Sequence, residues 1–208
     1  MGVLRGDWEF SKRWIDKSIA FATKYSFIDF FKRNARKEAD YYCHVGDYER
    51  AEKIILSNLP ETGYISGRYE AYLVGALGNI HTCSGFDDKA MEDYGRLLKF
   101  TSENNMPGWL AHANLGIANV NYKMGNYDEA RDFGNRARSL YAKIKQSWGI
   151  VMSTALLAAC DSRLHNRPIR HACSESVQYA ERMQYQSCIS SIEELENGVV
   201  SYLKLYFL

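Results

Sequence analysis

One short pattern recurs along the sequence at nearly constant spacing. The hexapeptide GNYDEA at 125–130 returns as GDYERA at 46–51, as GFDDKA at 85–90 and as GDWEFS at 6–11. The leading glycines are therefore 40, 39 and 40 residues apart. A fixed period in this range is typical of arrays in which each unit packs on its neighbours. The spacing predicts a single repeat domain over residues 1–208.

The stretch 115–140 indicates what one unit contains. An apolar helix is expected to run into Met124, and Gly125 with Asn126 supplies a tight corner that tolerates a positive φ. A second helix should begin at Tyr127, where acidic residues in the first turn favour the positive end of the helix dipole. The unit is thus a helical hairpin, and the chain is predicted to be all-α with no sheet.

The same pattern divides the whole chain into helix pairs. In the last pair Asn166 takes the corner position, since asparagine tolerates the left-handed conformation. The expected units are a partial one at 1–24, repeats at about 26–59, 66–103, 108–144 and 147–185, and a C-terminal helix at about 189–207.

The motif Gly-x-Tyr-x-x-Ala carries a family resemblance. With Ala51, Ala90, Ala130 and Ala172 where the two helices cross, the chain resembles tetratricopeptide repeats over nearly its whole length. That resemblance implies a right-handed α-solenoid of antiparallel helix pairs, a superhelix with a concave groove. The period of this chain exceeds the usual 34 residues of a tetratricopeptide repeat. In this respect the chain resembles the long-repeat variety found in sensor regions of bacterial regulators, such as the maltose-operon activator type and peptide-pheromone receptors.

Counting back from each corner tests whether the units share more than the turn. Seven residues before it stand small residues, as close helix packing requires: Ala39, Gly78, Ala118 and Ala159. Six residues before it stand Asp40, Asn79, Asn119 and Cys160, so three of four are polar. In the resembled family this position faces the groove, where an asparagine can both donate to and accept from a bound peptide backbone.

Neighbouring turns of the same helices extend the predicted groove. One turn earlier or later the same face would present Arg33, Arg36, Tyr72, Thr82, His112 and Tyr122. The alternative for Asn79 and Asn119 is that they cap nearby backbone groups and bind nothing. The cluster Lys32, Arg33, Arg36 and Lys37 either holds a carboxylate or phosphate or is simply a solvated face.

Composition and charge disfavour some classes of function. With a net charge of +1 and a pI near 7.6, the protein has no strong overall electrostatic field to attract polyanions, which disfavours direct nucleic-acid binding. No apolar run is long enough to span a membrane and the N-terminus lacks a signal-peptide core, so a cytoplasmic protein is expected. Five cysteines spread through helical segments fit reduced thiols.

Three pairs of histidine and cysteine raise the question of zinc. They are Cys43-His44, His81-x-Cys83 and His171-x-Cys173. Because Cys43 and Cys83 precede successive corners, we expect them to lie about a helix pair apart, on different repeats. No glycine-rich phosphate loop and no activated nucleophile is recognisable. No metal, cofactor or catalytic residue is therefore predicted.

The function predicted from these features is non-enzymatic binding of a peptide or protein in the concave groove, as a scaffold or adaptor. One alternative is the ligand-sensing or oligomerising region of a bacterial transcriptional or signalling regulator. Another is a structural assembly subunit. At the C-terminus, Val199, Val200, Leu203, Tyr206 and Phe207 recur at spacings of three and four. This apolar stripe on an end helix needs cover, and self-association through it is expected.

Overall fold

The computed structural model describes residues 7–61, 64–169, 171–198, 200 and 202–205, with the backbone alone for 28–33. These residues form ten α-helices and no strand. The helices are α1 (Trp8–Lys24), α2 (Ile28–His44), α3 (Tyr48–Leu56), α4 (Arg68–Ser84), α5 (Asp87–Glu103), α6 (Pro107–Met124), α7 (Tyr127–Lys143), α8 (Ser147–Leu164), α9 (Ser174–Arg182) and α10 (Gln186–Glu196).

The predicted corners have the expected backbone. Between α6 and α7, Gly125 has φ +86°, and α7 begins at Tyr127 as predicted. Gly46 and Gly85 have φ +84° and +86°, and Asn166 takes φ +50° at the corresponding place. Each of these residues ends a helix with the left-handed conformation that a C-terminal cap requires. The corner predicted at Gly6 lies outside the described residues.

A second left-handed corner repeats where the sequence shows no motif. Asn105, Lys145 and Gln184 have φ between +51° and +57° and follow α5, α7 and α9. These positions are 40 and 39 residues apart, the same period as the glycine corners. In the pairs α4–α5, α6–α7 and α8–α9, a left-handed residue therefore lies both between the two helices and after the second, which is compatible with a helical repeat.

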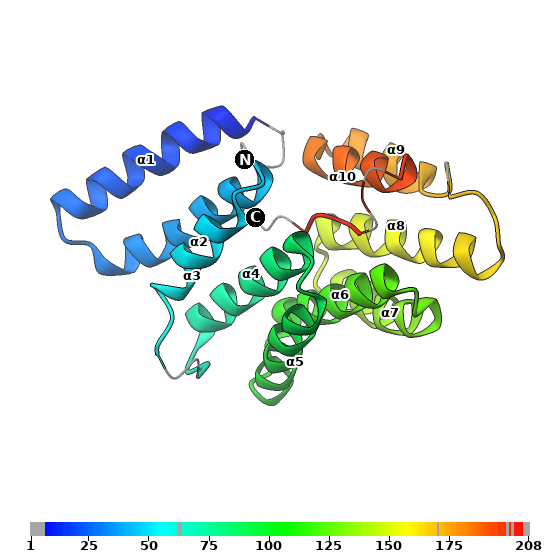
Figure 1. The fold of residues 1–208 in the computed structure, drawn as a ribbon, viewed down its shortest axis with the longest axis horizontal. Helices are drawn as coiled ribbons and strands as arrows, with labels where there is room; N and C mark the ends of the chain where they lie inside the picture. The colour runs from blue at the N-terminus through cyan, green and yellow to red at the C-terminus, as the bar shows by residue number, and fades with distance from the viewer. Residues whose placement is uncertain (1–6, 62–63, 170, 199, 201, 206–208) are drawn as a thin grey trace.

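The helices pack in sequence and fan out along an arc (Figure 1). Each helix contacts the next across its corner, and α2, α4, α6, α8 and α10 also contact one another in succession. We call these five the inner helices. In α6 every residue from Ala111 to Tyr122 is buried, whereas α5 and α7 bury only one stripe. An inner helix covered on all sides must be apolar or hydrogen-bonded all round.

Small residues allow the close packing that the sequence predicted. Ala39, Ala118 and Ala159 are fully buried. A Cβ added to Gly78 would lie 2.7 Å from the ring of Tyr94, which is itself fully buried. The expectation of small residues seven positions before each corner is confirmed at these sites.

The prediction of a C-terminal helix at 189–207 is wrong in its second half. Helix α10 ends at Glu196, and Gly198 follows with φ +70°. Asn197-Gly198 is a helix stop signal, because the left-handed turn ends the ladder of helical hydrogen bonds. The residues described beyond it, 200 and 202–205, are not helical, and Leu203 and Leu205 are fully buried within this chain. Val199, Tyr206 and Phe207, which complete the predicted stripe, lie outside the described residues.

Candidate functional site

The two predicted clamp asparagines both hold the chain's own C-terminal segment, by which we mean residues 200 and 202–205. Asn119 on α6 makes two hydrogen bonds to Leu203: its Oδ1 accepts from the backbone N–H at 2.8 Å, and its Nδ2 donates to the carbonyl at 2.7 Å. The side chain of Asn119 is buried. A carboxamide that meets both backbone groups of one residue recognises an extended chain without regard to its side chain.

Asn79 repeats the contact one unit earlier in the sequence. Its Oδ1 accepts from the backbone N–H of Leu205 at 3.2 Å and from the thiol of Cys83 at 3.8 Å. Its Nδ2 is buried without a hydrogen-bond partner among the described residues. Leu203 and Leu205 are two residues apart, which is the repeat of an extended strand. The segment thus advances two residues as it passes from α6 to α4.

The intervening residue is bound from the opposite side. The backbone N–H of Lys204 donates to Oγ of Ser191 on α10 at 2.7 Å. Its ammonium pairs with the carboxylate of Glu194 at 2.8 Å. Because successive N–H groups of an extended chain point in opposite directions, one edge of the segment faces α4 and α6 and the other faces α10. Figure 1 shows the segment crossing the interior of the arc between the N-terminal helices and α8–α10.

The side chains of Tyr202, Leu203 and Leu205 in the segment are buried, whereas those of Val200 and Lys204 are partly buried. Leu203 and Leu205 belong to the core, and the hydroxyl of Tyr202 donates to the carbonyl of Cys83 at 3.3 Å. The ammonium of Lys123 lies 5.1 Å from the centre of the Tyr202 ring, within cation–π range. Asn79, Asn119 and Ser191 together with these apolar surroundings form what we call the tail site.

On α2, Asp40 occupies the position that Asn79 and Asn119 occupy on α4 and α6, and Arg36 lies one helical turn before it. Their side chains form a buried ion pair, with Nε of Arg36 3.3 Å from Oδ2 of Asp40. Nη1 of Arg36 donates to the carbonyl of Tyr72 at 2.8 Å, and the guanidinium lies 4.8 Å from the Tyr72 ring centre. Burial raises the pKa of Asp40 to about 6, although the neighbouring guanidinium opposes the shift. This pair joins α2 to α4, while the side chain of Arg33 is outside the described residues.

The predicted aromatic groove residues contact other helices. His112 is fully buried, and its ring meets those of Tyr94 and Trp109 edge to face. Burial lowers the pKa of His112 well below its usual value, and the nearby charge of Arg36 adds to this, so the imidazole is neutral. The Tyr122 hydroxyl accepts a hydrogen bond from Nε of Arg163 at 3.4 Å. The ring of Tyr72 packs on Trp109 at 5.3 Å. These contacts join helices of the array.

Two cysteines expected to be apart come together. Cys43 on α2 and Cys83 on α4 belong to the same core cluster, because inner helices of successive units are in contact. The neighbouring Cys83 thiol and burial raise the pKa of Cys43 above its usual value. Burial raises the pKa of Cys160, Cys173 and Cys188 to about 12, so these thiols are protonated at neutral pH. No group of three or more His, Cys, Asp or Glu side chains suited to a metal occurs in the described part of the chain.

A buried histidine cluster was not anticipated from the sequence. Nδ1 of His81 lies 2.7 Å from Asp93 and Nε2 lies 3.0 Å from Glu52, so the imidazole bridges α3, α4 and α5. Burial lowers the pKa of His81, but the two carboxylate hydrogen bonds outweigh it and the pKa is raised overall. Nothing in the repeat motif identifies this cluster, because its three members come from different positions of the hairpins.

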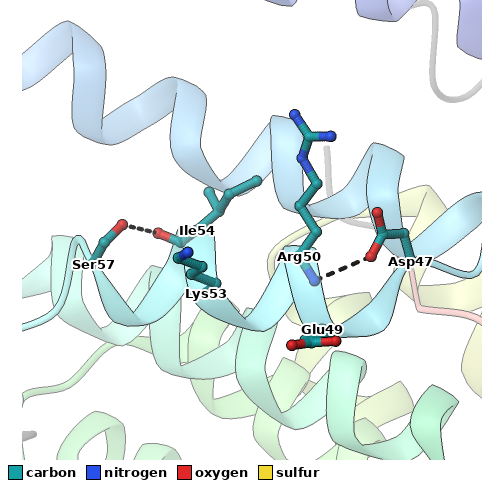
Figure 2. A pocket seen from close by; sticks show the side chains of 6 residues that line it. All are labelled: Asp47, Glu49, Arg50, Lys53, Ile54 and Ser57. Carbon is teal, nitrogen blue, oxygen red and sulfur yellow. Dashed lines mark hydrogen bonds between the residues drawn. The ribbon is translucent and has the colours of Figure 1, made fainter.

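The structure also has a surface hollow along α3. Its lining residues are Asp47, Glu49, Arg50, Lys53, Ile54 and Ser57. Figure 2 shows these side chains spaced along a single helix, with local hydrogen bonds from the Arg50 backbone to Asp47 and from Ser57 to the Ile54 carbonyl. The hollow lies along α3, whereas the tail site is formed by α4, α6 and α10. The polar groups of the hollow do not converge on a point. It therefore suggests no ligand.

The architecture defines an all-α protein of sequentially packed helices, compatible with a helical repeat. Comparisons with protein-family models, curated proteins and solved structures found no match. The resemblance to tetratricopeptide repeats therefore depends on the residues and the architecture given above. In the described part of the chain, no helix is long and apolar enough to cross a membrane.

Proposed function

We propose that this protein is a non-enzymatic, cytoplasmic binding module whose tail site accepts an extended segment of another polypeptide. The proposal includes the finer architecture implied by the family resemblance, a right-handed superhelix of antiparallel helix pairs with the tail site in its groove. The observation that supports it most directly is the pair of hydrogen bonds between Asn119 and the backbone of Leu203. Those bonds use only groups that every peptide carries.

The alternative interpretation is that Asn79 and Asn119 cap neighbouring backbone groups and bind nothing. Two other asparagines of α6 make bonds of that local kind. Asn114 donates to the carbonyl of Leu110 and Asn121 donates to that of Ile117, four residues back in the same helix. Asn119 instead bonds to a segment 84 residues away. Asn121 is thus a matched control, because it is also a buried asparagine of the same helix but bonds only to nearby residues.

The test uses the full chain with its own segment released by Leu203→Asp and Leu205→Asp. Each substitution places a charge where the structure buries a leucine, which strongly disfavours docking of the segment. A fluorescein-labelled peptide with the sequence of residues 198–208, GVVSYLKLYFL, is titrated with this variant and followed by anisotropy. We expect saturable binding that is lost on adding Asn119→Ala and retained on adding Asn121→Ala.

Chemistry on the peptide tests the backbone contact itself. N-methylation at the Leu203 position removes the N–H that donates to Asn119 and should abolish binding, whereas Lys204→Ala in the peptide should have little effect. If the Asn119→Ala variant bound the peptide as tightly as the Asn121→Ala variant, binding would be general apolar adsorption. The proposed function would then be wrong.

A further inference from the structure

We propose that the C-terminal segment is a tethered competitor that occupies the tail site until a peptide of similar chemistry displaces it. This inference rests on the proposed function, because it concerns the regulation of the same site. The segment and an external peptide would use the same groups on Asn79, Asn119 and Ser191, so the two occupants exclude each other.

The way in which the segment is held favours exchange. Among residues 203–205, each backbone N–H donates to a side chain, those of Asn119, Ser191 and Asn79, rather than to a backbone carbonyl. The segment is therefore not part of a helix or sheet that must unfold with it. Any extended backbone can make the same three bonds. Leu203 and Leu205 pack in one core cluster and Tyr202 in another, so a displacing peptide must supply apolar side chains in their place.

The attachment of the segment makes it a strong competitor. It follows α10 directly, through the left-handed turn at Gly198, and Ser191 and Glu194 of α10 bond to Lys204. A segment joined by so short a connection has an effective concentration on the order of millimolar at its own site. An external peptide sees only the fraction of molecules in which the segment is displaced, and its apparent affinity falls by that fraction.

The segment also defines the class of ligand. Leucines at two alternate positions are fully buried, and the aromatic ring before the first of them is buried beside Lys123. The residue between the leucines is a lysine paired with Glu194. A displacing ligand is accordingly an extended peptide with apolar side chains two residues apart, an aromatic residue before the first and a basic or neutral residue between them.

The first measurement compares affinities for the labelled peptide GVVSYLKLYFL between full chains. The wild type should bind it about tenfold or more weakly than the Leu203→Asp, Leu205→Asp chain, because only the wild type carries a competing occupant. His165→Gln is the control, because His165 is exposed at the end of α8 and makes no contact with the described residues of the tail site. Its affinity should stay close to that of the wild type.

The second measurement needs no variant. Hydrogen exchange on the wild type should show protected amides at Leu203 and Leu205, and excess unlabelled peptide should remove that protection.

Equal peptide affinity of wild type and released variant, or protection that persists when the peptide is saturating, would overturn the tethered competitor but leave the proposed function intact. A wild type that sediments as a dimer, with protection lost on dilution to monomer, would place the segment in a second copy and also overturn it. Absence of peptide binding to both the wild type and the folded released variant would overturn the proposed function itself.

Discussion

The carboxamide of Asn119 spans both backbone groups of Leu203, accepting from its N–H at 2.8 Å and donating to its carbonyl at 2.7 Å. All of these atoms are buried. The side chain predicted to hold a ligand therefore also contributes to the stability of the folded chain. Loss of this asparagine is therefore expected to affect the stability of the fold as well as the binding of a peptide.

Asn119→Ala should lower the free energy of unfolding by about 1–3 kcal/mol, because it leaves the N–H and carbonyl of Leu203 without their partner. Asn121→Ala should have a smaller effect. It removes a bond to the Ile117 carbonyl of its own helix and a longer one from the side chain of Asn126, and it introduces a better helix former. Urea unfolding of both variants beside the wild type measures the difference. Equal stability of the Asn119→Ala variant and the wild type would mean that the C-terminal segment is not docked in solution.

Gly78→Ala tests the close approach of α4 and the Tyr94 ring. The added methyl group would lie 2.7 Å from the ring of Tyr94, which is fully buried. Overpacking of this kind typically costs about 1–3 kcal/mol. Gly95→Ala on α5 is the control, because nothing lies within 4 Å of its Cβ position and alanine favours a helix. Thermal unfolding should therefore show a lower Tm for the first variant only, and a Gly78→Ala Tm at or above the wild-type value would contradict the packing.

The corner between α6 and α7 is tested by two substitutions of one residue. Gly125 has φ +86° and open space around its Cβ position, so only the backbone conformation resists a side chain. Gly125→Val should destabilise by about 1–2 kcal/mol, the cost of the left-handed conformation for an ordinary residue. Gly125→Asn should cost less, as asparagine already holds this conformation at Asn166. Equal unfolding free energies for the two variants would be evidence against a left-handed corner.

Much of the fold could be predicted from the sequence, because local chemistry decides its corners. The glycine or asparagine corners and the start of α7 follow from residues that tolerate positive φ beside acidic first turns. The end of α10 was missed for a related reason. The apolar spacing beyond Glu196 fits a helix and an extended strand alike, and Asn197-Gly198 decides between them.

The site was predictable in part. The position of Asn79 and Asn119 on the inner helices follows from counting back from the corners, but their partner lies 126 and 84 residues away in the sequence. No local pattern encodes such a contact. The meeting of Cys43 with Cys83 was likewise missed, because sequence spacing counts a whole helix pair between them whereas the inner helices are in direct contact.

The His81 cluster predicts a dependence of stability on pH. Carboxylate hydrogen bonds outweigh burial and raise the pKa of His81 in the folded chain above its unfolded value of about 6.5. Its stabilising contribution is therefore fully present below about pH 6.5 and is lost as the pH rises through the folded pKa. Urea unfolding of the wild type should give a higher free energy at pH 6.5 than at pH 8. His81→Gln should remove most of that difference, whereas His165→Gln at the exposed end of α8 should preserve it. A wild-type stability that rises over this interval and is unaffected by His81→Gln would show that the imidazole is not held in its charged form by Asp93 and Glu52.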